Sequence, residues 1–217
     1  MDSERAKKSG VIVALLVTLL PLLYFFPATR GQLFISPDDG VIQNIPFRVA
    51  IANQLHAGSL PLWNPSLFCG MPILGAAQAG VLFPLNWFYL VANPRVATNL
   101  MMLSTYLVAA LGAYLCARRS GSSIAGAGLT SLVWQASAFL VAQVGHTNIV
   151  HTAALLPWLI WTIDGYGATG DRRRGVALAI VVALQCFAGH HQSFAYALLV
   201  AAAYSIVLWR SSGRRAY

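Results

Sequence analysis

The sequence predicts an all-α integral membrane protein with about six transmembrane helices, and its composition and charge pattern lead to this class. Apolar residues make up 58% of the 217 residues and charged residues 9%, and the mean hydropathy is +0.65. A soluble domain carries roughly a quarter charged residues, because water must wet its surface. The net charge of +8 comes from short basic clusters between long apolar runs, which is typical of topology signals. We therefore expect a lipid-facing surface and no nucleic-acid partner.

Six apolar runs approach the roughly 20 residues that a helix needs to cross a bilayer core. The first is long for the apolar core of a secretory signal and is followed by a poor cleavage site, so we expect it to be retained. The fifth is short and is followed by Gly189-His190-His191, which predicts a tight helical hairpin with the sixth. The runs are 10–26, 96–117, 122–144, 147–163, 175–189 and 192–209, and they predict a single membrane domain over residues 1–217.

Lysines and arginines predict the orientation, because cytoplasmic loops carry an excess of them. With a cytoplasmic N-terminus, eleven of the 14 basic residues lie inside, and residues 28–95 form a large extracytoplasmic first loop of an inner (plasma) membrane protein. Asp164 then lies at the inner interface beside the Arg172 cluster, where we expect a structural role. The inner residues are Arg5, Lys7, Lys8, Arg118, Arg119, Arg172, Arg173, Arg174, Arg210, Arg214 and Arg215. The outer ones are Arg30, Arg48 and Arg95.

The uncharged stretch Gly70–Ala92 is long enough to be counted as a seventh span. It contains Pro72, Pro84 and Asn86, and its insertion would move the later arginine clusters to the outer face. We therefore predict a re-entrant or interfacial hairpin within the first outer loop. Non-helical backbone persists at membrane depth only where protein buries it or where it lines a wet cavity, so this hairpin implies a cavity.

A short helix is expected earlier in the same loop. Asn44-Ile45-Pro46 suits a helix start, because proline is tolerated in the first turn, and Gly58 suits its end. Phe47, Ile51 and Leu55 recur at a spacing of four residues and form one apolar face. This pattern predicts a helix that lies on the membrane surface.

Unusual polar residues gather on the same outer face. Asp38 and Asp39 stand in a turn after the first span, and all five histidines fall outside the spans or near their outer ends. Zinc takes about three or four convergent ligands, and the spacing of five between His146 and His151 does not place them on one helix face. We predict no metal site for the histidines, and phosphate or sugar binding and helix capping stay open. The five are His56, His146, His151, His190 and His191.

The first loop carries a set of motifs in a fixed order: an aspartate after the first span, a Pro-Phe helix, Gly-x-Leu-Pro-x-Trp-Asn-Pro at residues 58–65 and Phe-x-Gly-x-Pro at residues 68–72. This order resembles the YfhO-like family of bacterial membrane proteins. The resemblance extends from about Pro37 to Trp161, and the first-loop portion is its specific part. The downstream matches are Gln78, Pro84-Leu85-Asn86 and Pro157-Trp158.

This resemblance implies a GT-C-type glycosyltransferase that moves a sugar from a polyprenyl-phosphate-linked donor to an acceptor at the outer membrane face. In that group an aspartate of the first outer loop acts at the reaction centre, which corresponds here to Asp38 or Asp39. A carboxylate suits the acceptor hydroxyl as a base, and two adjacent carboxylates also suit a divalent cation. The expected substrate-binding residues are Arg30, Arg48, His56, Trp63, Asn64, Gln78, His146, His151, His190 and His191.

Two other functions stay open. One is a transporter or flippase component that binds a lipid-linked or polar solute without reacting it, and the other is a non-catalytic membrane assembly subunit. A transporter is expected to carry inverted repeats and broken helices in matching positions, and the sequence shows no such symmetry. Family members are generally longer, so we expect this chain to be the N-terminal portion of such a protein. The expected partners are a lipid-linked sugar donor and membrane lipid.

Overall fold

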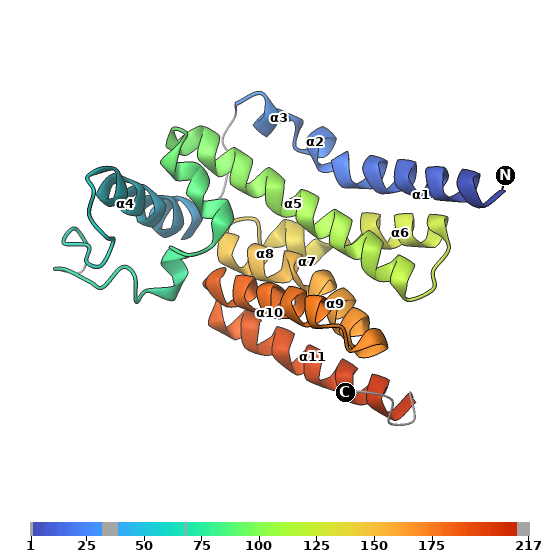
Figure 1. Ribbon diagram of the computed structural model, residues 1–217. Coiled ribbons are helices and arrows are strands. Elements are labelled where there is room, and N and C mark those ends of the chain that lie inside the picture. Colours follow the sequence, from blue (N-terminus) through green and yellow to red (C-terminus); the bar gives the residue numbers. More distant parts are fainter. Residues whose placement is uncertain (1, 32–38, 68, 212–217) are drawn as a thin grey trace.

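The computed structural model describes residues 2–31, 39–67 and 69–211, and its long helices run side by side as a bundle (Figure 1). Within these residues there is no strand, only one antiparallel bridge between Asn64 and Met71, so the all-helical prediction is confirmed. The elements of the bundle are α1 (Asp2–Leu19), α2 (Pro21–Tyr24), α3 (Phe26–Thr29), α5 (Pro94–Arg119), α6 (Ile124–Gln135), α7 (Ala138–Ala142), α8 (Thr147–Ala154), α9 (Leu156–Thr169), α10 (Arg172–Phe187) and α11 (His191–Ser211).

Four stretches of the bundle are long and apolar enough to cross a membrane, in agreement with a membrane protein. They are Lys7–Tyr24, Pro94–Arg119, Ile124–Ala142 and His191–Ser211. The predicted runs at 147–163 and 175–189 are also helical, but each of their helices is shorter than these four stretches. The first is divided into helices of 8 and 14 residues, and α10 has 16 residues.

Helix α5 is the centre of the bundle. It contacts α1, α6, α8 and α9. Of the residues in its most apolar part, 61% are buried, whereas the corresponding share is 11% for Lys7–Tyr24 and 6% for α11. Met101, Tyr106 and Ala109 of α5 have no exposed surface. In contrast, Leu16 of α1 is 65% exposed and Leu199 of α11 is 68% exposed. Large exposed apolar surfaces of this kind mark contact with a membrane or a partner, so α1 and α11 form the outside of the bundle.

Local chemistry explains why two of the predicted runs are interrupted. The Ser137 hydroxyl accepts a hydrogen bond from the Leu140 N–H at 3.3 Å and caps α7, which begins a new helix after α6. Pro157 stands in the first turn of α9, where its missing N–H costs nothing, and it prevents α8 from continuing. The predicted runs 122–144 and 147–163 are therefore each made of two consecutive helices, and Ile124–Ala142 remains one stretch that is long and apolar enough to cross a membrane.

The two ends of the bundle differ in charge. Helix α4 (Ile45–His56) and the segment that follows it lie at one end, while the N-terminus and the turn between α5 and α6 lie at the opposite end (Figure 1). Arg118 and Arg119 end α5, and Arg172 to Arg174 begin α10, so these clusters lie at the end opposite to α4. We call the end with α4 the loop end and the other the basic end.

The segment from Gly70 to Ala92 forms no long helix. It contains two 3-10 turns, Ala77–Ala79 and Pro84–Leu90, and it packs on α4. Phe47 and Ile51 of α4 share a buried cluster with Ile73 and Ala79. The apolar face of α4 that we expected to lie on the membrane surface is therefore covered by the chain itself, because residues 73–79 offer it an apolar partner.

Gly189, in the turn between α10 and α11, allows this turn to touch the loop-end segment. Its φ is +90°, and a Cβ there would lie 2.2 Å from the Ala77 carbonyl oxygen. Gly189→Ala is expected to cost about 2–5 kcal/mol, because left-handed strain and overpacking against backbone add. The melting temperature in detergent measures this loss. Gly170 (φ +62°) has open space around it, so Gly170→Ala should cost about 1–2 kcal/mol. Equal losses in both variants would contradict the close contact.

Candidate functional site

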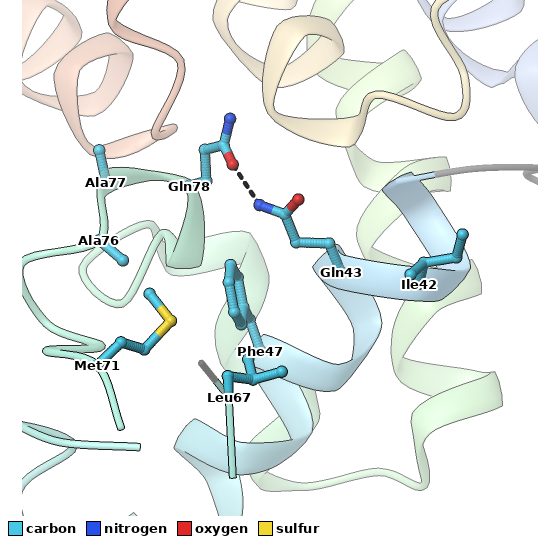
Figure 2. Close-up of a pocket in the computed structure, with 8 residues that line it drawn as sticks. All are labelled: Ile42, Gln43, Phe47, Leu67, Met71, Ala76, Ala77 and Gln78. Carbon is cyan, nitrogen blue, oxygen red and sulfur yellow. Dashed lines mark hydrogen bonds between the residues drawn. The ribbon is translucent and has the colours of Figure 1, made fainter. Parts of the chain in front are cut away.

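A cavity of about 490 Å³ lies at the loop end, between the start of α4 and the segment around residue 76 (Figure 2). Small-molecule sites typically have volumes of about 300–1,000 Å³. The lining is mainly apolar, and its two polar side chains, Gln43 and Gln78, hydrogen-bond to each other through Nε2 of Gln43 and Oε1 of Gln78. The lining residues are Ile42, Gln43, Phe47, Leu67, Met71, Ala76, Ala77 and Gln78.

Arg48, one turn into α4, is a buried cation beside this cavity wall. It is 1% exposed, and its Nη2 donates hydrogen bonds to Thr147 Oγ1 at 2.9 Å and Asn148 Oδ1 at 2.8 Å. Its Nε and Nη1 have no hydrogen-bond partner in the described part of the chain. Burial lowers the Arg48 pKa to about 10, and the neighbouring Tyr89 acts in the opposite direction. The guanidinium is therefore charged at neutral pH.

Asn148 connects Arg48 to the cavity. Its Oδ1 accepts from Arg48, and its Nδ2 donates to the Gln78 backbone carbonyl at 2.7 Å. One amide therefore holds the first turn of α8 against both α4 and the loop-end segment. A buried guanidinium is stabilised only when its N–H groups find acceptors, which explains why these three elements meet at this point.

Asp39 and His146 lie close to each other at the loop end. Asp39 precedes the π-helical turn Gly40–Asn44, which supplies Gln43 to the cavity, and its Oδ2 lies 4.0 Å from His146 Nε2. The Asp39 side chain is 56% exposed and the His146 side chain 42%, so solvent or a ligand can reach both. Asp38, the other predicted catalytic residue, lies outside the described residues.

His190 lies near His146 and performs a capping function. Its Nδ1 accepts a hydrogen bond from the Ser193 N–H at 3.1 Å and is 2.7 Å from the Ser193 hydroxyl. Burial lowers the His190 pKa, and His146 and His191 act in the same direction, so the ring is held neutral as a cap acceptor. His191 is exposed at the first position of α11. Helix capping, one of the roles that the sequence left open for the histidines, is therefore what the His190 side chain does in this structure.

Four of the predicted substrate-binding residues make local contacts that do not bring them to the cavity lining. Arg30 lies over the Phe26 ring, with its Cζ 4.5 Å from the ring centre. His56 Nε2 is 2.8 Å from the Leu90 carbonyl oxygen. The remaining two organise the turn after α4. Trp63 lies against Gly70, and Asn64 pairs with Met71 and accepts from the Ser66 N–H at 2.9 Å.

His151 is directed away from the outer cavity. It is 0% exposed, and its Nδ1 lies 2.8 Å from Thr105 Oγ1 of α5, in the interior between α5 and α8. His151 lies one turn into α8, near the end of the predicted run, but its side chain points into the bundle and not to the accessible outer face. In the described residues no group of three or more His, Cys, Asp or Glu side chains is placed to hold a metal ion.

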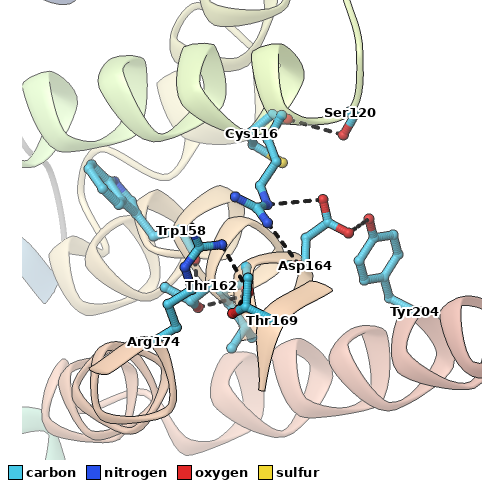
Figure 3. Close-up of polar contacts among 11 residues, drawn as sticks. Cys116, Ser120, Trp158, Thr162, Asp164, Thr169, Arg174 and Tyr204 are labelled. Atoms are coloured by element: carbon cyan, nitrogen blue, oxygen red, sulfur yellow. Dashed lines mark hydrogen bonds and ion pairs between the residues drawn. The ribbon is translucent and has the colours of Figure 1, made fainter. Parts of the chain in front are cut away.

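Asp164 of α9 links this helix to α5 and α11 at the basic end (Figure 3). Its Oδ2 is 3.2 Å from Arg119 Nε of α5, in ion-pair range although this N–H makes no hydrogen bond. Its Oδ1 accepts a long, 3.4 Å hydrogen bond from the Tyr204 hydroxyl of α11. Arg174 Nη1 of α10 donates to the Gly165 carbonyl at 3.0 Å. These contacts fit a structural role, with Arg119 rather than Arg172 as the partner.

Three residues of the site, Gln43, Thr147 and Asn148, were not predicted from the sequence. For Thr147 and Asn148 a signal was present, because both are polar residues at the edge of an apolar run. The site combines an exposed carboxylate, an imidazole, three amides and a buried guanidinium beside a mainly apolar cavity. Comparison of the chain with protein-family models, with curated proteins and with solved structures gives no match.

Proposed function

We propose that the protein is a GT-C-type membrane glycosyltransferase that resembles the YfhO-like family and acts at its loop end. The observation that carries this proposal is the accessible Asp39 carboxylate, 4.0 Å from His146, next to the α8 residues that the Arg48 guanidinium holds. A carboxylate and a fixed cation are the two groups that sugar transfer from a phosphate-linked donor uses. The donor is a polyprenyl-phosphate-linked sugar.

The proposed topology has six crossings of the inner (plasma) membrane. In this arrangement α1, α5, α6 with α7, α8 with α9, α10 and α11 alternate in direction, and the basic end faces the cytoplasm. The excess of arginine and lysine at that end supports this orientation. The loop end, with Asp39 and the cavity, then faces the extracytoplasmic side. The shorter α10, with 16 residues, is accommodated by local thinning of the bilayer.

The proposed reaction places one carboxylate, Asp39 or Asp38, at the acceptor hydroxyl. The O–H bond of the acceptor breaks and its proton passes to the carboxylate, while the oxygen forms a bond to the anomeric carbon. The bond between that carbon and the phosphate oxygen breaks, and its electron pair leaves with the phosphate. Positive charge or N–H donors close to the departing phosphate lower the barrier, and we assign this role to the His146 side chain, 4.0 Å from Asp39, together with the fixed charge of Arg48.

The experiment that tests this function is transfer of a radiolabelled sugar from a panel of polyprenyl-phosphate donors, in membranes that contain the natural protein. Labelled product that depends on the protein is expected. Parallel reactions with and without a chelator report whether Asp38 and Asp39 act through a divalent cation. Absence of product with every donor would contradict the enzyme proposal.

A second candidate is a transporter or flippase component, and the interruptions at Ser137 and Leu155 are the observation that favours it. Transporters bind substrates where membrane helices are discontinuous, and α6–α7 and α8–α9 are discontinuous in this way. Protein-dependent movement of a lipid-linked sugar across proteoliposomes, without chemical change of that lipid, would support this candidate over the transferase.

A further inference from the structure

A smaller cavity, of about 200 Å³, lies at the basic end, where α9 contacts both α5 and α10. Helix α5 contributes its last residue, Arg119, and α10 contributes Arg173 and Arg174 from its first turn. None of the lining residues belongs to the cavity at the loop end, so this is a separate site. The remaining lining residues are Trp161, Thr162 and Gly165 of α9 and Ala177 of α10.

Two of these guanidinium groups approach each other beside Gly165. A Cβ placed on Gly165 would lie 3.6 Å from Arg119 Cζ and 3.6 Å from Arg174 Nη1, so these two atoms are separated by at most twice this distance. Both groups fit here because Gly165 has no side chain. Unit charges at such a separation repel each other, most strongly where water is partly excluded. An anion placed between them would replace this repulsion by attraction.

Only one of the three arginines has a carboxylate partner in the part of the chain that the structure describes. Arg119 Nε is 3.2 Å from Asp164 Oδ2, and Arg119 Nη2 donates to the Asp164 backbone carbonyl at 3.0 Å. Arg174 Nη1 donates at 3.0 Å to a backbone carbonyl, which is neutral (Figure 3). Asp171 caps α10 through the Arg173 backbone N–H, and within the same residues the Arg173 guanidinium makes no hydrogen bond or ion pair. The cavity therefore carries an excess of positive charge.

Several guanidinium nitrogens of this lining are open to a ligand. The Arg119 side chain is 23% exposed, Arg173 is exposed and Arg174 is partly buried. Arg119 Nη1 and Arg174 Nη2 make no hydrogen bond with any described residue, and neither atom is buried. A ligand in the cavity therefore meets N–H donors from two helices without displacing an existing bond.

Phosphate is the anion that this set of donors suits best. A guanidinium presents its N–H groups in a planar fork that matches two phosphate oxygens, and it stays charged at every physiological pH. The apolar part of the lining, from Trp161 and Ala177, suits the carbon skeleton that carries the phosphate. The volume corresponds to about seven water molecules by their share of liquid volume, which accommodates a phosphate and a glycerol unit but no acyl chain.

The place of the cavity favours a lipid as the carrier of this phosphate. The cavity lies where α5 ends and α10 begins, which is headgroup depth for helices that cross a bilayer. Tryptophan is enriched at this depth, and basic pockets between membrane helices bind anionic lipid headgroups. A headgroup can therefore enter the cavity from the membrane surface while its acyl chains remain outside.

We propose that the cavity at the basic end binds the phosphate of an anionic phospholipid, with Arg119, Arg173 and Arg174 at its oxygens and Trp161 beside its glycerol. The bound phosphate neutralises the repulsion beside Gly165 and so joins α5 to α10. This site rests on the placement of the bundle in a membrane and not on the proposed sugar transfer, because it lies at the end opposite to α4.

The test measures binding of three probes to the purified full chain in detergent by native mass spectrometry. Dioleoyl phosphatidylglycerol should bind about tenfold more tightly than dioleoyl phosphatidylcholine, whose acyl chains are the same but whose choline cation the arginines repel. Glycerol 3-phosphate, the soluble probe, should not displace the bound lipid at equal concentration. Equal binding of the two lipids would overturn the proposal, and displacement by glycerol 3-phosphate would overturn the lipid as the source of the phosphate.

Two matched pairs of variants locate the site. Arg173→Gln should reduce the preference for phosphatidylglycerol about fivefold, the value of one basic residue at a lipid surface. Arg172→Gln changes the exposed neighbour that does not line the cavity and should leave the preference unchanged. Ala177→Phe fills the cavity and keeps every arginine, so it should abolish the preference, whereas Ala179→Phe, at an exposed position of the same helix, should not. Equal losses in Arg173→Gln and Arg172→Gln, or a preference that persists in Ala177→Phe, would contradict the proposed location.

Discussion

Asp39→Asn is expected to lower the rate of sugar transfer about 10²- to 10⁴-fold, the loss typical when a general base is removed. Asparagine keeps the size of the side chain but cannot take the proton of the acceptor hydroxyl. The Asp39 side chain is 56% exposed and makes no capping hydrogen bond, so the folded protein should form normally. The rate is measured with the radiolabelled donor, beside the melting temperature of each variant.

Asp171→Asn is the matched control for this change. Asp171 caps α10 at the basic end, where its Oδ1 accepts from the Arg173 N–H at 3.3 Å, so its loss should leave transfer intact. Asp38→Asn is made in parallel, and loss of transfer in that variant alone would assign the base to Asp38. Normal transfer by both Asp38→Asn and Asp39→Asn would rule out a catalytic role for either carboxylate.

Asn148→Leu is expected to destabilise the protein by about 3–5 kcal/mol, the cost typical of removing a partner from a buried charge. Arg48 is 1% exposed, and among the described residues it would lose one of the two acceptors of its Nη2, keeping Thr147. The hydrogen bond to the Gln78 carbonyl would be lost as well. The melting temperature in detergent is the measurement, taken at one scan rate for all variants because unfolding of such proteins is often irreversible.

The double variant Arg48→Met/Asn148→Leu should recover a substantial part of that loss, because it removes the cation that was left without partners. Gln185→Met serves as the control for a buried neutral amide. Gln185 is 0% exposed, donates to the Thr152 carbonyl at 3.1 Å and has an Oε1 without a partner in the described part of the chain, so its replacement should change stability by less than about 1 kcal/mol. If the double variant is no more stable than Asn148→Leu, the charge of Arg48 is not the source of the cost.

The sequence predicted the helical class and the approximate positions of the helices, because apolar runs of helical length leave few other structures available in a membrane. It also predicted the limits of α4, since Pro46 and Gly58 act within one or two turns of their own position. The breaks at Ser137 and Leu155 had local signals too, in a serine before an apolar run and in Pro157. Those signals were outweighed by the length of the apolar runs.

The candidate site was harder to predict, because its contacts join residues far apart in the chain. Nothing in the residues around Arg48 indicates that its partners are Thr147 and Asn148, and so it was expected on an accessible outer surface. His151 was expected to bind substrate for a similar reason, since the direction of its side chain depends on where α8 starts. The sequence indicated that the histidines and Asp39 belong to the loop end, but only the packing distinguishes buried groups from exposed ones.

The contacts of Arg48 and Gly189 also set an order for biogenesis. Arg48 belongs to the first third of the chain, yet its acceptors are made about a hundred residues later, and Gly189 reaches Ala77 later still. In the proposed topology, the segment from α4 to α5 is translocated while the ribosome is still supplying the second half of the chain, and so before its final neighbours are made. During that interval the Arg48 guanidinium is hydrated, and the apolar residues of this segment are still exposed. The contacts at the loop end are therefore complete only after the hairpin of α10 and α11 has been made, so that this end of the bundle is assembled last.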